Sequence, residues 1–156
     1  MANAAAICTS FKVDLFNGLH AFGTSVVRAG TSADAFKCAL YQTTGSIGVG
    51  TTAYTASNEV ATAGGYSAGG ASVTNATAPT SSGTTAYWTP SASITWTGVN
   101  FTTDCCLIYN NTLAGKNAVA SFALGAIGTG QTVSGGGNFT LTMPTNAVGT
   151  ALLQIA

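Results

Sequence analysis

Charged side chains are almost missing from this chain of 156 residues. Only 5% of the residues are charged and the formal net charge is zero, whereas about 25% charged residues is usual in a globular protein. Without a basic stripe the chain has nothing to neutralise a row of phosphates, so we expect no nucleic-acid partner. It also lacks a polybasic patch for an anionic membrane surface.

Long hydrophobic runs are also missing. The longest smooth apolar stretch, residues 118–128, is shorter than the roughly 20 residues that a membrane-spanning helix needs, and it contains Gly and Ser. The first residues, Met-Ala-Asn-Ala-Ala-Ala-Ile, lack the positive and sustained apolar regions of a secretory signal. We therefore expect no membrane association. Because 46% of the residues are hydrophobic, a folded domain is expected rather than a disordered chain.

Residue types that carry catalysis or bind metals are scarce. His20 is the single histidine, and the cysteines Cys8, Cys38, Cys105 and Cys106 lack Cys-x-x-Cys spacing, so no usual zinc set can be assembled. The chain has no Gly-x-Ser-x-Gly elbow, and we interpret the histidine as structural, bonded to a backbone carbonyl. Four cysteines allow three disulfide connectivities, among which the sequence does not choose. Buried thiols are favoured over disulfides.

The acidic residues do not indicate an active site either. Asp14, Asp34, Glu59 and Asp104 are the only four, which makes a dedicated carboxylate pair for glycoside hydrolysis unexpected. Their positions predict simpler roles on a helix face, before a strand, in a polar loop and at a strand entry. No glycine cluster is followed by the Lys-Ser/Thr of a phosphate cradle. We expect no enzyme activity, metal or cofactor.

The clearest signal for a strand lies in residues 35–44. Phe36, Cys38 and Leu40 alternate with the residues between them, which predicts a half-buried strand. The segment Cys-Ala-Leu-Tyr-Gln-Thr-Thr that starts at Cys38 has an echo, Cys-Leu-Ile-Tyr-Asn-Asn-Thr, at residues 106–112. We interpret the two as strands of one core with similar environments rather than as a repeat.

A short helix is predicted at residues 10–17, within an N-terminal arm that covers residues 1–22. Ser10 can cap it, Phe11 and Leu15 lie near one face, and an Asn-Gly pair ends it. This helix is interpreted either as a plug at one end of a β-core or as a docking arm. Both roles can hold together.

Further strands recur about every ten residues. They are predicted at residues 19–28, 72–78, 84–88, 93–96, 101–110, 117–124, 139–143 and 151–155, with a turn at 79–83 and an exposed glycine-rich loop at 125–137. This spacing predicts one all-β domain over residues 1–156, an antiparallel β-sandwich of the jelly-roll or immunoglobulin-like kind with one short N-terminal helix.

Large aromatic residues outside the strongest strands point to an interface. A sugar-binding platform is less expected than core or assembly contacts, because no acidic or amide cluster accompanies these rings. A surface of zero net charge also favours association. The candidate interface residues are Phe11, Leu15, Phe16, Tyr54, Tyr66, Tyr87 and Trp88.

Several segments in order resemble a family of small β-rich structural proteins of tailed bacteriophages. They are Ser-Phe-Lys-Val-Asp-Leu-Phe-Asn-Gly-Leu-His-Ala-Phe at 10–22, Phe-Lys-Cys-Ala-Leu-Tyr at 36–41, Thr-Thr-Ala-Tyr-Thr-Ala-Ser-Asn-Glu-Val at 51–60, Gly-Gly-Tyr-Ser-Ala-Gly-Gly at 64–70, and the ending from Asn-Phe-Thr-Leu-Thr-Met-Pro at 138–144 through Ala-Leu-Leu-Gln-Ile-Ala at 151–156. The resemblance implies a virion component and carries over no catalytic residue.

Similar proteins act as capsid cement or decoration proteins. The resemblance therefore implies a chain that is assembled in the host cytoplasm and binds the major capsid protein on the exterior of the virion. A dimer or trimer of the chain is expected. The alternative is a tail or fibre β-module that binds host-surface carbohydrate.

Overall fold

The computed structural model describes residues 2–22, 33–75 and 78–156. Within them the chain forms one helix and ten strands, and every strand pairing is antiparallel, which confirms the all-β class. In chain order the elements are β1 (Ala6–Ile7), α1 (Thr9–Phe16), β2 (Phe36–Tyr41), β3 (Ala71–Val73), β4 (Thr80–Ser82), β5 (Thr85–Trp88), β6 (Ile94–Thr103), β7 (Cys105–Asn110), β8 (Ala118–Ala123), β9 (Gln131–Leu141) and β10 (Leu153–Ile155).

The centre of the molecule is a five-stranded sheet in the order β1-β8-β7-β2-β3. In β2 every residue except the half-buried Lys37 is buried, so the prediction of a half-buried strand there is wrong. Side chains on both faces of β2 are buried. The alternation of residue types in its sequence therefore does not correspond to an alternation of buried and exposed side chains. Cys38 lies opposite Ile108 and Leu40 opposite Cys106. The two echoing segments are thus neighbouring strands, which confirms that they belong to one core.

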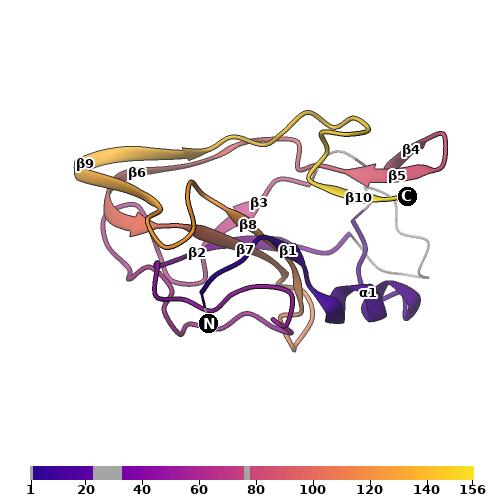
Figure 1. Cartoon of the computed structure of the whole chain (residues 1–156), viewed down its shortest axis with the longest axis horizontal. Coiled ribbons are helices and arrows are strands. Elements are labelled where there is room, and N and C mark those ends of the chain that lie inside the picture. The colour runs from indigo at the N-terminus through magenta and orange to yellow at the C-terminus, as the bar shows by residue number, and fades with distance from the viewer. Residues whose placement is uncertain (1, 23–32, 76–77) are drawn as a thin grey trace.

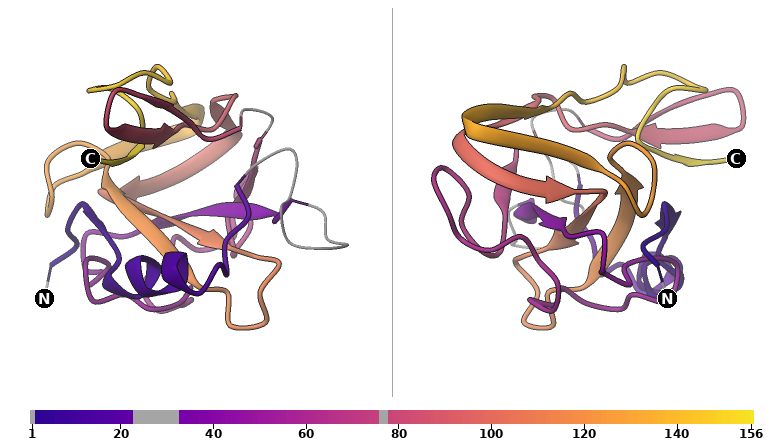
Figure 2. Two further views of the ribbon diagram at one scale, coloured as in Figure 1. Left: turned by 90° about the vertical axis from the view of Figure 1, so that its right-hand side faces the viewer. Right: turned by 60° about the vertical axis from the view of Figure 1, so that its left-hand side comes forward.

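The strands β6 and β9 form a separate two-stranded ribbon. Figures 1 and 2 show β6 between β9 and the five-stranded sheet. Threonines on its exposed side form cross-strand hydroxyl contacts, Thr95 with Thr140 at 3.0 Å and Thr102 with Thr132 at 2.8 Å. The loop predicted at 125–137 is wrong in its second half, because β9 already begins at Gln131.

Glycines explain why the strands of this ribbon were predicted with the wrong bounds. Two separate strands were predicted at 93–96 and 101–110, but β6 runs through Gly98, whose φ is 66°, and the break comes later, at Asp104. The ladder shifts register between Trp96 and Val99. A β-bulge of this kind lets a strand hold a glycine in the left-handed region without ending.

A third sheet, in the order β10-β5-β4, stands beside α1 at one end of the molecule (Figure 1). The turn predicted at 79–83 is wrong in its middle, where β4 forms, because the chain reverses only at Gly83 (φ 57°). The strands predicted at 84–88, 117–124 and 151–155 are confirmed as β5, β8 and β10. Most of the strand predicted at 19–28 lies outside the described residues, and residues 19–22 contain no strand.

The predicted helix is confirmed to within one residue at each end. Its cap is not: Ser10 lies inside α1, and its hydroxyl donates to the Thr51 carbonyl at 3.4 Å. Cys8 occupies the cap position and makes no side-chain cap bond. The helix ends at the predicted Asn-Gly pair. The Gly18 amide donates a hydrogen bond to the Leu15 carbonyl, and the glycine adopts a φ of 64°. No helix in the described residues is long and apolar enough to cross a membrane.

All four carboxylates are buried. Asp14, Asp34, Glu59 and Asp104 are each at most 8% exposed. Their predicted positions along the chain are correct: the three aspartates lie as expected, and Glu59 lies in the loop between β2 and β3, where it is buried and forms an isolated β-bridge with Tyr41. A buried charge is costly unless hydrogen bonds replace water, so each carboxylate needs donors.

Glu59 receives its donors from tyrosines and the backbone. Its Oε1 accepts hydrogen bonds from the Tyr66 hydroxyl and the Gly69 amide, both at 2.7 Å, and its Oε2 accepts one from the Tyr54 hydroxyl at 2.7 Å. The Tyr66 oxygen also accepts from the Leu40 amide at 2.9 Å. This network fastens residues 54–70 to the buried strand β2.

The network predicts that Tyr66→Phe destabilises the fold strongly. The change leaves the Leu40 amide without a partner and removes one donor from a buried carboxylate. Each such loss costs about 1–3 kcal/mol, so we expect the free energy of unfolding to fall by about 3 kcal/mol in urea titrations. Tyr87→Phe is the matched control, because no hydrogen bond of the Tyr87 hydroxyl is found among the described contacts. Equal losses in the two variants would contradict the prediction.

Candidate functional site

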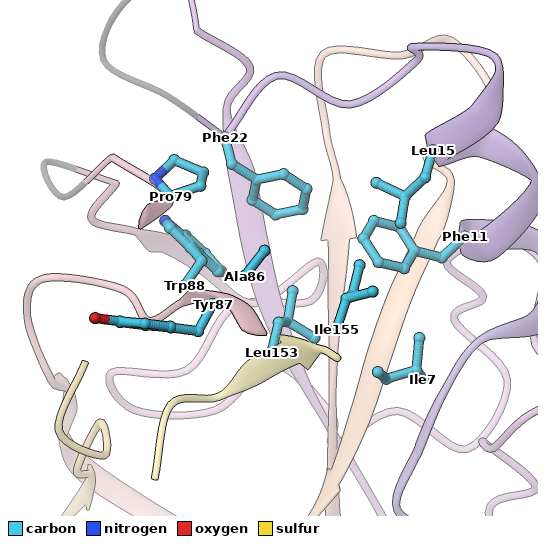
Figure 3. A pocket seen from close by; sticks show the side chains of 10 residues that line it. All are labelled: Ile7, Phe11, Leu15, Phe22, Pro79, Ala86, Tyr87, Trp88, Leu153 and Ile155. Atoms are coloured by element: carbon cyan, nitrogen blue, oxygen red, sulfur yellow. The ribbon is translucent and has the colours of Figure 1, made fainter. Parts of the chain in front are cut away.

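An apolar groove lies where α1 faces β5 and β10 (Figure 3). One part of it has a volume of about 170 Å³, and it adjoins a wider hollow of about 650 Å³ along α1 and the end of β10. The smaller part is lined by Ile7, Phe11, Leu15, Phe22, Pro79, Ala86, Tyr87, Trp88, Leu153 and Ile155. Three separate regions of the chain therefore build the groove.

The floor of the groove continues into the core. Phe11 and Leu15 are four residues apart on α1, so both project toward β10. The Phe11 ring meets Phe22 edge-on at 5.8 Å, and Phe22 stacks on Phe36 at 4.4 Å. Phe22 also lies 4.7 Å from Trp88. These contacts fix the aromatic floor in place.

The rim of the groove is exposed although it is apolar. Ile155 is 53% exposed and Leu15 is 36% exposed, whereas Phe11 and Trp88 on the floor are each 3% exposed. Burying apolar surface contributes about 25 cal/mol per Å², so a partner that covers the rim gains free energy.

Buried polar side chains hold α1 in position below the groove. Asp14 Oδ2 lies 3.2 Å from His20 Nε2 and accepts a hydrogen bond from Asn117 Nδ2 at 2.8 Å. Asn110 Nδ2 lies 3.1 Å from His20 Nδ1, and because a carboxamide nitrogen can only donate, this contact favours the tautomer with its proton on Nε2, facing Asp14. The predicted partner of the histidine, a backbone carbonyl, is thus replaced by a carboxylate and a carboxamide.

His20 is poorly placed for catalysis. Both ring nitrogens are engaged by Asp14 and Asn110, and its side chain has 0% exposure. A general base must reach the proton that it abstracts within hydrogen-bond distance, and this ring has no open path to a ligand in the groove. Its geometry is that of a structural anchor for α1.

The chemistry of the groove is that of apolar burial. Among the described residues that line its two parts, only Lys12 has a charged side chain. The lining offers no paired carboxylates and no nucleophile beside a base. In the described part of the chain no group of three or more His, Cys, Asp or Glu side chains could hold a metal ion. The lining of the groove suits the binding of an apolar surface.

Four of the seven predicted interface residues meet in this groove. Phe11 and Leu15 come from α1, and Tyr87 and Trp88 come from β5. Tyr54 and Tyr66 lie elsewhere, around Glu59, and Tyr66 has 0% exposure, so the structure places it in the core. Phe16 is the last residue of α1, and its side chain lies outside the described part.

Sequence reasoning missed the other wall of the groove. Leu153 and Ile155 face it from β10, while Ile7 reaches it from β1. A strand was predicted at residues 151–155, but the sequence did not indicate that this strand would lie at a sheet edge with one residue exposed. These side chains are accessible to a partner because of their position at the edge of the sheet, not because of their residue type.

The tryptophans give little support to the sugar-binding alternative. Trp88 and Trp96 are each 3% exposed, so neither indole face is open to stack on a sugar ring. The Trp88 Nε1 donates to Asn75 Oδ1 at 2.9 Å, which holds the ring edge in place.

The four cysteines are buried free thiols, as predicted. Burial raises the pKa of Cys8 to about 11 and that of Cys105 to about 12. The hydrogen bond between Cys106 and Cys38 on the neighbouring strand, together with burial, raises the pKa of Cys106 well above its usual value. Reactive cysteines have low pKa values and partial exposure, so these thiols are packing residues.

Known proteins offer no guide to the groove. No family model matches the chain, and neither the curated proteins nor the solved structures contain a significant match. The geometry of the groove is therefore the guide to its role, and the resemblance to phage structural proteins stays a prediction.

The raised thiol pKa values predict a loss of stability in alkali. Below about pH 8 the thiols keep their protons in both the folded and the unfolded chain. Above the ordinary value of 9.0 the unfolded chain releases protons that folded Cys8 and Cys105 retain until about pH 11 and 12. The free energy of unfolding should therefore fall as pH rises, by about 1.4 kcal/mol per pH unit for each thiol.

Urea titrations between pH 7 and pH 11 measure this slope. Cys105→Ala should show a shallower fall than the unchanged chain, because it lacks one of the three thiols whose pKa is raised in the folded chain. The native chain should also react slowly with a thiol reagent at pH 8 until urea is added. Reaction of all four thiols at the rate of a free peptide cysteine would contradict the burial that underlies both expectations.

Proposed function

We propose that this chain is a non-enzymatic structural protein of a tailed-phage virion, a cement protein that binds the major capsid protein on the outside of the shell. The observation that carries the proposal is the apolar groove with an exposed rim, in which Phe11, Leu15, Tyr87 and Trp88 gather. Four of the seven residues proposed from sequence for an interface thus line one groove. The resemblance of several segments to phage structural proteins supplies the kind of partner.

The near absence of charge supports a binding role of this type. Removing a charged group from water costs several kcal/mol unless a partner compensates for it, and this chain has only 5% charged residues. Its surface can therefore be covered at a low desolvation cost. On a shell each copy contacts several neighbours, so weak single contacts add up to tight attachment.

The packing of the ribbon on the five-stranded sheet supports a rigid body that keeps its shape on the shell. Tyr66 lies beneath the ribbon, with its ring 6.1 Å from Trp96 of β6 and 6.0 Å from Phe101. We infer that the ribbon and the five-stranded sheet form the two layers of a β-sandwich of the jelly-roll or immunoglobulin-like kind. Such a body keeps its shape when it binds, so little conformational entropy is lost on the shell.

The proposed role implies a location and a set of partners for the protein. The chain is assembled with the particle in the host cytoplasm and ends on the capsid exterior of the virion. There it binds capsid subunits through the groove and other copies of itself, as a dimer or trimer.

Binding to empty shells tests the proposal. Purified chain added to empty capsids of its own phage should cosediment with them and raise their melting temperature. Ile155→Lys places a charge on the groove rim and should weaken binding at least tenfold, which corresponds to about 1.4 kcal/mol or more. Ile155 is 53% exposed, so this variant is expected to fold.

Ile127→Lys is the matched control. Ile127 is also exposed, at 37%, but it does not line the groove. It should bind shells as the unchanged chain does. A chain that does not bind shells would contradict the cement role, and equal binding by both variants would contradict the role of the groove.

A further inference from the structure

The outer edge of β9 is a long strand edge without a partner. Within the described residues β9 pairs with β6 alone, so along its other side the backbone amides and carbonyls that point outward have no strand to bond. The strand has 11 residues. Figures 1 and 2 show it along the margin of the molecule, with β6 between it and the rest.

This edge has neither the charges, the proline nor the short length that usually hinder strand pairing, and a β-bulge is its one interruption. Natural proteins blunt open edges with charges, with proline, with β-bulges or by keeping edge strands very short. The sequence of β9, QTVSGGGNFTL, has no charged residue and no proline, whereas the edge strands β1, β3, β4 and β10 have only two or three residues each. The bulge lies at Gly135 and Gly136, whose φ values are 67° and 72°, so regular strand backbone is available on either side of these two residues.

The outer edge of β6, by contrast, is obstructed at its middle. The segment that contains Gly64 and Gly65 lies so close that a Cβ on Gly65 would lie 2.1 Å from the carbonyl oxygen of Thr97. A Cβ on Gly64 would lie 1.9 Å from the carbonyl oxygen of Gly98. An incoming strand therefore cannot run along the middle of β6 without displacing this segment.

We propose that β9 pairs antiparallel with β9 of a second copy of this chain, which joins the two ribbons into a four-stranded sheet. Two identical strands pair in this way about a twofold axis, so each edge meets itself. Charges near such an axis would face like charges, which destabilises cross-strand pairs. The uncharged β9 avoids this repulsion, and because the other side of each ribbon is obstructed, pairing stops at the dimer.

The dimer does not depend on a shell, so its test is separate from that of the cement role. Analytical ultracentrifugation of the purified chain should show a reversible monomer–dimer equilibrium. Asn138→Lys and Ser134→Lys place exposed charges on β9, where copies would bring them together, and each should raise the dimer dissociation constant at least tenfold. Asn111→Lys makes the same change in an exposed turn away from β9 and should have no effect.

Cross-linking gives a second readout that does not depend on charge. The native thiols are buried, so single cysteines introduced along 131–141 can be oxidised selectively. A twofold antiparallel pair predicts disulfide formation that is strongest at one position and falls away on both sides of it. A monomer throughout the micromolar range, open polymers, or dimers unaffected by Asn138→Lys would each overturn the proposal. Loss of shell binding with the dimer intact would overturn the cement role alone.

Discussion

The fold depends on the hydrogen bonding of four buried carboxylates. Each one ties a loop or the helix to the five-stranded sheet, because a carboxylate removed from water must accept bonds from the groups around it. Asp104, with 0% exposure, accepts from the Asn3 side chain at 2.6 Å and the Gly128 amide at 2.7 Å, which joins the N-terminal segment to the loop after β8. Asp34 accepts from the Ala21 amide and from Asn110.

The burial of the four carboxylates also determines which residue types are exposed to solvent. With its acids inside, the molecule shows almost no negative charge to solvent, and Thr, Ser, Asn and Gly make up most of the exposed positions. Asp14 holds α1 through His20 and Asn117, and this places Phe11 and Leu15 against β10. The groove is thus a consequence of the buried network, and so is a surface that can be covered at little electrostatic cost.

The sequence predicted the parts of the fold that depend on local pattern. The all-β class, the helix at 10–17 and the central strands β2, β7 and β8 follow from periodicity and β-branched or aromatic residues. The ribbon was not predicted, because Gly98 in β6 and the glycines at 135–137 in β9 weigh against a strand in any local reading, while a bulged ladder accommodates them.

The candidate site was predicted in part for a similar reason. Large apolar residues outside the strongest strands stand out in the sequence, and four of them, Phe11, Leu15, Tyr87 and Trp88, line the groove. The sequence therefore predicted part of its lining. Ile155 looks in sequence like any core residue, and only its place on an edge strand exposes it. Nothing near Glu59 in the chain marks it as buried, because its partner Tyr66 and the strand below are brought to it by the fold.

A cryo-electron microscopy map of the virion, with this chain fitted into it, tests the central claim most directly. The account predicts density for the chain on the outer face of the shell, with the groove between α1 and β10 occupied by a capsid subunit. A particle whose shell lacks the chain, or one in which that groove faces solvent in every copy, would contradict it.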